Sequence, residues 1–265
     1  MSLVLHLSDT HFGVERSEVV QALLRLAEQQ RPDLAVLSGD VTQRARHDEF
    51  AAARRFVDAL SAGRTLVVPG NHDLPLFDVG RRLFMPYRNH RRTFGRNLEP
   101  VYEDHGLLVV GIRTTRRYRH VDGTVSPLQV VRSSERLRRS GARIKLVVTH
   151  QPVHVESAAD QHNLLRGRER ALHGWAAAGA NLILGGHIHL PFVAPLKVAH
   201  GLPREVWAVQ AGTAVSWRTR PGVPNSVNLI HCDAQHGSCR IERWDFDDPT
   251  QAFTCRAATA MTLDG

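Results

Sequence analysis

The amino-acid sequence predicts an α/β protein, and three features of the chain carry this prediction. Short apolar runs alternate with helical patterns as far as His189, as in strands that are joined by right-handed helical crossovers. The apolar runs are rich in Val, Leu and Ile and lack polar alternation, as expected of strands buried on both faces. Five of these runs are followed at once by residues that can bind metals. Because ligands of such sheets gather at the carboxyl ends of the strands, we expect the five polar blocks to meet.

The predicted elements follow one another in a regular order. Apolar runs predict strands over residues 3–7, 34–37, 66–68, 144–148 and 182–184. Apolar residues at helical spacing predict helices between them, and Val19, Leu23 and Leu26 form one such stripe over residues 17–30. Further helices are expected over residues 48–61, 133–139 and 164–178.

Beyond His189 the pattern changes. Strand patterns without long helices between them cover residues 192–198, 205–209, 227–232 and 240–246. They predict a second, largely antiparallel sheet over about residues 190–265, packed on the first. No linker or repeat is visible, so we expect one domain over residues 1–265. The tail from Asp247 to Gly265 has two open interpretations, a dimer arm or a frayed end, so a homodimer remains an open alternative.

Composition narrows the class of protein. The chain is 42% hydrophobic and 23% charged, which is ordinary for a globular protein. No apolar run approaches the roughly 20 residues that span a bilayer, and no signal peptide is visible. Cys232, Cys239 and Cys255 are expected to be free thiols, with a Cys232–Cys239 disulfide as the alternative. We therefore expect a cytoplasmic protein, with peripheral attachment to a membrane as an alternative.

The polar blocks after the strands contain seven candidate metal ligands, namely Asp9, His11, Asp40, Asn71, His150, His187 and His189. Such a mixture of oxygen and nitrogen donors favours Zn, Mn, Fe or Co over Ca or Mg. Seven donors are too many for one tetrahedral ion and suit two ions that share a bridge. A carboxylate can offer one oxygen to each ion, so Asp40 is the natural bridging ligand. Two-metal sites clamp the attacking and leaving oxygens of a phosphoryl displacement.

Each block has an ordinary structural explanation when it is taken alone. An Asp-x-His pair is often a surface turn, and a Gly-Asn-His-Asp sequence is often a tight turn. The recurrence of five blocks, each directly after a predicted strand, favours the metal site over these explanations.

The five blocks together resemble the calcineurin-like metallophosphoesterase superfamily: Asp9-Thr10-His11, Gly39-Asp40, Gly70-Asn71-His72-Asp73, Thr149-His150 and Gly186-His187-Ile188-His189. The resemblance extends from Leu3 to about His189. It implies a four-layer α-β-β-α sandwich of two mixed sheets, with a dinuclear metal centre at the carboxyl ends of the strands. The whole chain would then be a single metallophosphoesterase domain.

The resemblance also implies roles for individual residues. One metal would take Asp9, His11, Asp40 and His189, and the other would take Asp40, Asn71, His150 and His187. A bridging hydroxide would be the nucleophile. His72 would be the acid or the orienting group at the leaving oxygen, with a purely structural role as the alternative.

Within the superfamily the chain is similar to the bacterial branch that includes cyclic nucleotide and glycerophosphodiester phosphodiesterases. The similarity rests on the compact size, the opening Leu7-Ser8-Asp9-Thr10-His11 and the block from Val68 to Asp73. It implies a phosphodiesterase, with a 3',5'-cyclic nucleotide as the first substrate to expect. The alternatives are phosphodiester or pyrophosphate hydrolysis of phospholipid-type, glycerophosphodiester or nucleotide-lipid substrates, then a nuclease or a phosphomonoesterase, and finally a scaffold of the same fold without activity.

One segment carries an unusual charge. Residues 81–96 hold six arginines interleaved with Leu, Phe, Met and Tyr, and we expect a helical cap over about residues 75–98 near the metals. The net charge is +8 and the isoelectric point is about 10.3. An anionic substrate, an anionic membrane surface and a nucleic acid would all suit this segment. A merely solvated face is the alternative.

Overall fold

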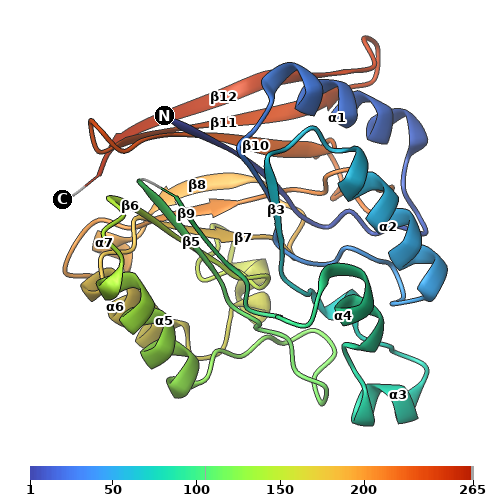
Figure 1. Ribbon diagram of the computed structural model, residues 1–265, viewed down its shortest axis with the longest axis horizontal. Coiled ribbons are helices and arrows are strands. Elements are labelled where there is room, and N and C mark those ends of the chain that lie inside the picture. Colours follow the sequence, from blue (N-terminus) through green and yellow to red (C-terminus); the bar gives the residue numbers. More distant parts are fainter. Residues whose placement is uncertain (105, 264–265) are drawn as a thin grey trace.

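The strands form two six-stranded mixed sheets that face each other (Figure 1). The structure is a computed structural model, and it describes residues 1–104 and 106–263. The first sheet has the order β12-β11-β10-β1-β2-β3. Its strands are β1 (Ser2–Leu7), β2 (Leu34–Leu37), β3 (Arg64–Val67), β10 (Ser226–Asp233), β11 (Ser238–Asp247) and β12 (Ala252–Thr262).

The second sheet has the order β4-β5-β6-β7-β9-β8. Its strands are β4 (Val101–Asp104), β5 (Leu107–Gly111), β6 (Ile144–Val148), β7 (Leu182–Gly185), β8 (Phe192–Pro195) and β9 (Trp207–Gln210). Parallel pairs join β5 to β6, β6 to β7, and β7 to β9, so these four strands end at the same edge.

Two pairs of helices cover the outer faces of the sheets. On one side of the molecule lie α1 (Ser17–Gln30) and α2 (His47–Ala59), and on the opposite side lie α5 (Pro127–Arg139) and α6 (Arg168–Ala177) (Figure 1). The shorter helices are α3 (Val79–Phe84), α4 (Arg88–Phe94), α7 (Lys197–His200) and the 3₁₀ turns η1 (Asn71–Asp73) and η2 (Ala158–Asn163).

Three apolar cores separate the four layers. Leu5, Leu23 and Ala53 belong to the core between the first sheet and its helices. Val4, Val36 and Leu146 belong to the core between the two sheets. The third core, between the second sheet and its helices, holds Leu172 and Trp175. The predicted four-layer α-β-β-α sandwich is confirmed, and it explains why the central strands are apolar on both faces.

The prediction of a separate second sheet over residues 190–265 is wrong. Strands β10 to β12 extend the first sheet from the edge of β1, where Val4 pairs with Ile230. Strands β8 and β9 extend the second sheet from the edge of β7, where Leu184 pairs with Val209. A local sequence pattern indicates that a strand forms, but its partner is decided by which open sheet edge lies beside it. The predicted strand over residues 192–198 ends at Pro195, and the chain then enters α7.

Several boundaries differ from the expected ones for local reasons. Helix α5 begins at Pro127 because the side chain of Ser126 caps it, accepting a hydrogen bond from the backbone N–H of Gln129 at 3.2 Å. Helix α6 begins only at Arg168, after η2. Residues 252–262 of the tail form β12, an edge strand paired with β11. Strands β4 and β5 were missed by the sequence analysis.

Two further expectations concern the thiols and the membrane. The cysteines are free, although Cys232 and Cys239 lie opposite each other on β10 and β11 with their sulfurs 3.7 Å apart. No helix among the described residues is both long enough and apolar enough to cross a membrane.

Replacing Trp175 by alanine should destabilise the core between the second sheet and its helices. Its side chain is fully buried between α6 and the second sheet, and its Nε1 donates to the Ser133 hydroxyl on α5 at 2.7 Å. Truncating a buried Trp costs about 3–5 kcal/mol of unfolding free energy. Urea unfolding measures the loss, and Val198→Ala on an exposed site of α7 is the control. A loss below about 1 kcal/mol would contradict the assigned packing.

Candidate metal centre

Every predicted ligand lies in the loop that follows the carboxyl end of a strand. Asp9 and His11 follow β1, Asp40 follows β2 and Asn71 begins η1 after β3, all in the first sheet. His150 follows β6, and His187 and His189 follow β7, in the second sheet. The candidate centre therefore draws its donors from both sheets and depends on the way the sheets pack together.

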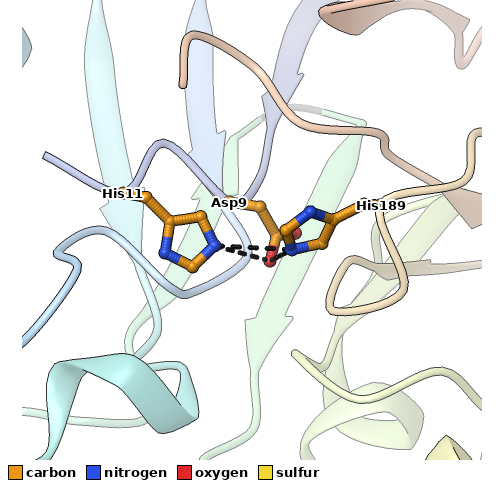
Figure 2. Close-up of side chains that lie close together, drawn as sticks. All are labelled: Asp9, His11 and His189. Carbon is orange, nitrogen blue, oxygen red and sulfur yellow. Dashed lines mark hydrogen bonds and ion pairs between the residues drawn. The ribbon is translucent and has the colours of Figure 1, made fainter. Parts of the chain in front are cut away.

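The first donor cluster consists of Asp9, His11 and His189 (Figure 2). Oδ1 of Asp9 lies 3.7 Å from Nε2 of His11 and 3.2 Å from Nε2 of His189. The two Nε2 atoms lie 3.4 Å apart. One carboxylate oxygen and two imidazole nitrogens thus face the same small space.

The second donor cluster consists of Asp40, Asn71, His150 and His187. Nε2 of His150 lies 3.3 Å from Oδ1 of Asp40 and 3.0 Å from Oδ1 of Asn71. The donor atoms of Asp40, His150 and His187 all lie within 4.8 Å of one another.

Asp40 stands between the two clusters. Its Oδ1 faces His150 at 3.3 Å, and its Oδ2 lies 3.9 Å from Nε2 of His11. The backbone N–H of His72 donates to Oδ1 at 2.7 Å and fixes the orientation of the carboxylate. One oxygen is therefore turned toward each cluster, as a bridging ligand requires.

Several buried donor atoms of the centre have no hydrogen-bond partner among the described residues. They are Oδ1 of Asp9, Nδ1 of His11 and both ring nitrogens of His187. Buried polar atoms in proteins are nearly always satisfied, so each exception needs an explanation. A carboxylate and imidazoles that converge without hydrogen bonds fit a pair of transition-metal ions, whose preferred ligands they are.

The backbone is strained where the donors are placed. Five of the eight non-glycine residues with a positive φ in the described chain are candidate ligands: Asp9 (52°), His11 (43°), Asp40 (48°), His187 (76°) and His189 (57°). Asp and His tolerate this left-handed region better than most residues, yet each such position costs of order 1–3 kcal/mol. Strain concentrated at one set of side chains indicates that their placement, and not local stability, determines this backbone.

Two glycines allow the donors to approach one another. A methyl group on Gly70 would overlap the backbone nitrogen and Oδ1 of Asp40. A methyl group on Gly186 would overlap the Ser8 hydroxyl and come within 2.6 Å of Oδ2 of Asp9. The glycines of these two blocks are therefore needed for close contact between loops.

Burial and mutual charge shift the pKa values of the metal-free centre. Burial opposes ionisation of Asp9 and Asp40, but the charges of the neighbouring histidines outweigh it and hold both pKa values well below the usual range. Burial lowers the pKa of His150, but the charge of Asp40 outweighs it and raises that pKa to about 9. Burial, aided by the charge of His150, lowers the pKa of His187 to about 3. Without metal, the centre thus holds two carboxylates and at least one imidazolium near neutral pH.

Hydrogen bonds behind the donors fix their directions. Nδ1 of His150 donates to the carbonyl oxygen of Ser38 at 2.9 Å, and Nδ1 of His189 donates to the carbonyl oxygen of Arg218. Both rings therefore turn Nε2 toward the centre. The carboxylate of Asp73 accepts from the backbone N–H groups of Gly70 and Thr42, so it holds the loops together.

His72 is not among the predicted ligands, although a ring nitrogen of it lies within 4.8 Å of donor atoms of His11 and Asp40. Its ring centroid is 4.8 Å from that of His11. Nδ1 donates to the carbonyl oxygen of Gln43 at 2.8 Å, so in the neutral ring Nε2 is an acceptor. Nη1 of Arg218 donates to this Nε2 at 2.9 Å. In this arrangement His72 positions the guanidinium of Arg218 beside the two donor clusters.

Arg218 was missed by the sequence analysis. It lies in the loop between β9 and β10, and its Nη1 also donates to Oε1 of Gln43 at 3.2 Å. Its sequence surroundings, Trp217-Arg218-Thr219-Arg220-Pro221-Gly222, look like an ordinary turn. One arginine among the 34 lysines and arginines of the chain gives no signal of its own.

Comparison with known proteins agrees with this architecture. A family model described as calcineurin-like phosphoesterase matches residues 2–191. Glycerophosphodiester phosphodiesterase GpdQ of Enterobacter lignolyticus is 37% identical over 84 residues, which is 27% of this chain and 29% of that protein. A probable cyclic nucleotide phosphodiesterase of Synechococcus is 27% identical over 169 residues, which is 62% of this chain and 61% of that protein.

Among solved structures, the purple acid phosphatase PPD1 of yellow lupin superposes with a TM-score of 0.76 at 12% sequence identity. The superposition covers 99% of this chain and 54% of the lupin chain. At this identity the likeness concerns the fold alone. The chain thus matches less than two thirds of the length of the two curated relatives and of this structural neighbour.

When metal is added to the apo protein, its binding should displace a proton from His150. Because its pKa is raised to about 9, the ring is protonated at pH 7 and must lose that proton to become a ligand. Metal affinity should therefore rise by up to about tenfold per pH unit from pH 7 to pH 9, and more gently above. Calorimetry in buffers of different ionisation enthalpy measures the released protons. His150→Asn should lose this component, and equal affinity at pH 7 and pH 9 would contradict the assignment.

Proposed function

Because this chain belongs to the calcineurin-like phosphoesterase family, we propose that it is a dinuclear-metal phosphodiesterase. The observation that carries the proposal is the position of Asp40, whose two carboxylate oxygens face two separate donor clusters. A single-metal site would need neither the bridge nor the second cluster. The whole chain would act as one domain, with residues 75–98 as a cap beside the centre.

The proposed ligand sets follow the two clusters. Asp9, His11, Asp40 and His189 would hold one ion. Asp40, Asn71, His150 and His187 would hold the other, and the mixed donors suit Mn, Fe, Zn or Co. When bound, such ions lower the pKa of coordinated water and neutralise charge on phosphoryl oxygens.

Two further side chains would act on the substrate directly. The guanidinium of Arg218 offers planar N–H donors that match the oxygens of a phosphoryl group. We assign it the binding of a non-bridging oxygen. Before substrate binds, the 2.9 Å hydrogen bond to His72 keeps the guanidinium beside the centre. When Arg218 turns to the phosphate, Nε2 of His72 is freed. In the imidazolium form, where both ring nitrogens carry a proton, Nε2 would donate its proton to the leaving oxygen. Asp40 and His72 are thus the proposed catalytic residues.

The substrate class is a phosphodiester, and a 3',5'-cyclic nucleotide is the first member to test. The support is that one curated relative is named a probable cyclic nucleotide phosphodiesterase and another a glycerophosphodiester phosphodiesterase. Both names describe hydrolysis of a diester. Phospholipid-type and nucleotide-lipid diesters are the next class to test, because the cap and the loop beside it carry arginines and exposed apolar side chains.

Hydrolysis of bis(p-nitrophenyl) phosphate should exceed that of p-nitrophenyl phosphate when manganese is added. Asp40→Asn should lower diester hydrolysis by about 100-fold or more, because the bridging charge is lost. It should also reduce the bound metal measured by elemental analysis. Asp58→Asn, at an exposed site on α2, is the matched control.

Two results would contradict the phosphodiesterase. Preference for the monoester would indicate a phosphatase. Absence of bound metal and of both activities in the wild-type protein would indicate a scaffold. If the model diester is hydrolysed in preference to the monoester, the next step is to compare two natural diesters, cyclic AMP and glycerophosphoethanolamine.

Arg218→Gln should raise KM and lower kcat/KM about 10- to 100-fold, since a charge-assisted hydrogen bond to a phosphoryl oxygen is worth about 1.5–3 kcal/mol. Arg218→Lys should recover part of the loss. Metal content should not change, because the side chain is not a proposed ligand. Arg220→Gln removes the same charge from the same loop, but Arg220 is engaged by Asp160 at 2.9 Å and should affect KM little. Equal effects of both variants would contradict the assigned role.

A further inference from the structure

Apolar side chains gather on the cap, where they are exposed to solvent. Six of the fourteen exposed large apolar or aromatic side chains of the described chain lie between Leu76 and Met85. Phe84 is 82% exposed, Phe77 78% and Val79 64%. Helix α3 has no buried residue at all, and it lies at the periphery of the molecule (Figure 1). Scattered apolar residues need no explanation, but a contiguous group of this kind indicates an interaction surface.

Beside this apolar group lies a pocket of about 960 Å³ that is lined mainly by arginines. Helix α4 and the following turn contribute four of them, and the loop after β5 contributes Arg113, Arg116 and Arg117. Phe84, Tyr87 and Tyr118 supply aromatic walls. We call the exposed apolar group and this pocket together the cap surface.

The arginines of the pocket are not neutralised by ion pairs. Elsewhere arginines pair with carboxylates, as Arg54 does with Asp58 and Arg220 with Asp160. None of the seven pocket arginines has such a pair among residues 1–104 and 106–263. The one carboxylate whose charge acts on Arg116 is Glu99, and it accepts instead from the amide of Gln129. The positive charge of the pocket is therefore available to an external anion.

The cap surface is one connected structure that borders the metal centre. Arg82 on α3 donates to the carbonyl oxygens of Arg117 and Arg119, each at 2.8 Å. Arg117 donates in return to the carbonyl oxygen of Leu83 at 2.9 Å. The same loop carries His120, whose ring centroid lies 6.0 Å from that of His72. An anion bound at the cap surface would thus lie on the approach to the centre.

We propose that the cap surface binds the face of an anionic phospholipid bilayer. Exposed Phe and aliphatic side chains insert among the lipid chains at such an interface, while arginines bind the phosphates. The pocket is large enough to receive a lipid headgroup beneath the inserted side chains. This binding goes beyond diester hydrolysis and does not depend on it.

Charge complementarity favours this partner over two others. A second copy of the chain would place like-charged arginines against each other across a twofold interface. A nucleic acid would use the arginines and aromatic rings for phosphates and bases, but it would leave Val79, Leu83 and Met85 in water. The bilayer is the partner that uses both the charge and the aliphatic side chains.

Co-sedimentation with vesicles tests the proposal directly. Wild-type protein should bind vesicles of phosphatidylglycerol and phosphatidylcholine at least tenfold more tightly than vesicles of phosphatidylcholine alone. Phe77→Ser/Phe84→Ser and Arg91→Gln/Arg92→Gln should each weaken this binding at least tenfold. Added salt should weaken the residual vesicle binding of the Phe77→Ser/Phe84→Ser variant more than that of the Arg91→Gln/Arg92→Gln variant.

The controls are matched in chemistry. Val198→Ser removes an exposed apolar side chain on α7, and Arg138→Gln/Arg139→Gln removes two exposed arginines on α5. Both should bind vesicles like the wild-type protein. All four variants should keep the far-UV circular dichroism spectrum and the urea midpoint of the wild-type protein, which shows that they fold.

Three outcomes would overturn the proposal. They are equal binding to neutral and anionic vesicles, retention of binding by the phenylalanine variant, and binding of an oligonucleotide but not of vesicles. The last result would identify a nucleic-acid surface. If wild-type protein binds anionic vesicles but hydrolyses no diester, the proposed function fails and the membrane surface stands.

Discussion

The structure depends on two carboxylates, Asp9 and Asp40, that are held almost completely out of solvent at the meeting point of the two sheets. A buried carboxylate is costly unless positive charge and hydrogen bonds surround it. Here the compensation comes from both sheets, since His150 and His189 approach from the second sheet while the carboxylates belong to the first. The electrostatic requirement of the centre is thus also a reason why the four layers must pack in one register. Cations in the centre would meet the same requirement more fully than protonated histidines do.

This requirement explains features that otherwise look unfavourable. Left-handed backbone at five donor positions and buried ring nitrogens without partners both reduce stability. Asp73 shows how the loss of stability is distributed. Burial and the charge of Asp40 raise the pKa of Asp73 to about 6. The hydrogen bonds that its carboxylate accepts nevertheless hold the Asp40 and Asn71 loops together. The loops are stable because the strands behind them are anchored in three apolar cores.

The sequence predicted what is local and missed what is decided at long range. Each of the seven donors lies close in sequence to the end of its own strand and to the glycines of its block. This pattern can therefore be recognised in a single sequence. The structure does bring the seven side chains together. The pairing of β10 with β1 joins Ile230 to Val4, and nothing near either residue specifies it. Arg218 reaches His72 from 146 positions away and from a turn that resembles many others. Helix α5 is an intermediate case, because Ser126-Pro127-Leu128-Gln129 carries a capping signal that apolar periodicity alone does not detect.

The two positive regions of the molecule differ in how their charge is balanced. At the centre, histidines stand against carboxylates within 4 Å, so the charge is internal and serves to place donors. At the cap, the seven arginines of the pocket have no ion pair within the part of the chain that the structure describes, so their charge acts outward. A field of this kind steers anions and raises their local concentration. Arg82 ties α3 to the loop that brings His120 beside His72, so the cap is connected to the side of the centre where Arg218 lies. The outward charge and the converging donors therefore belong to different residues, so a change in the arginines of the cap would leave the donors in place.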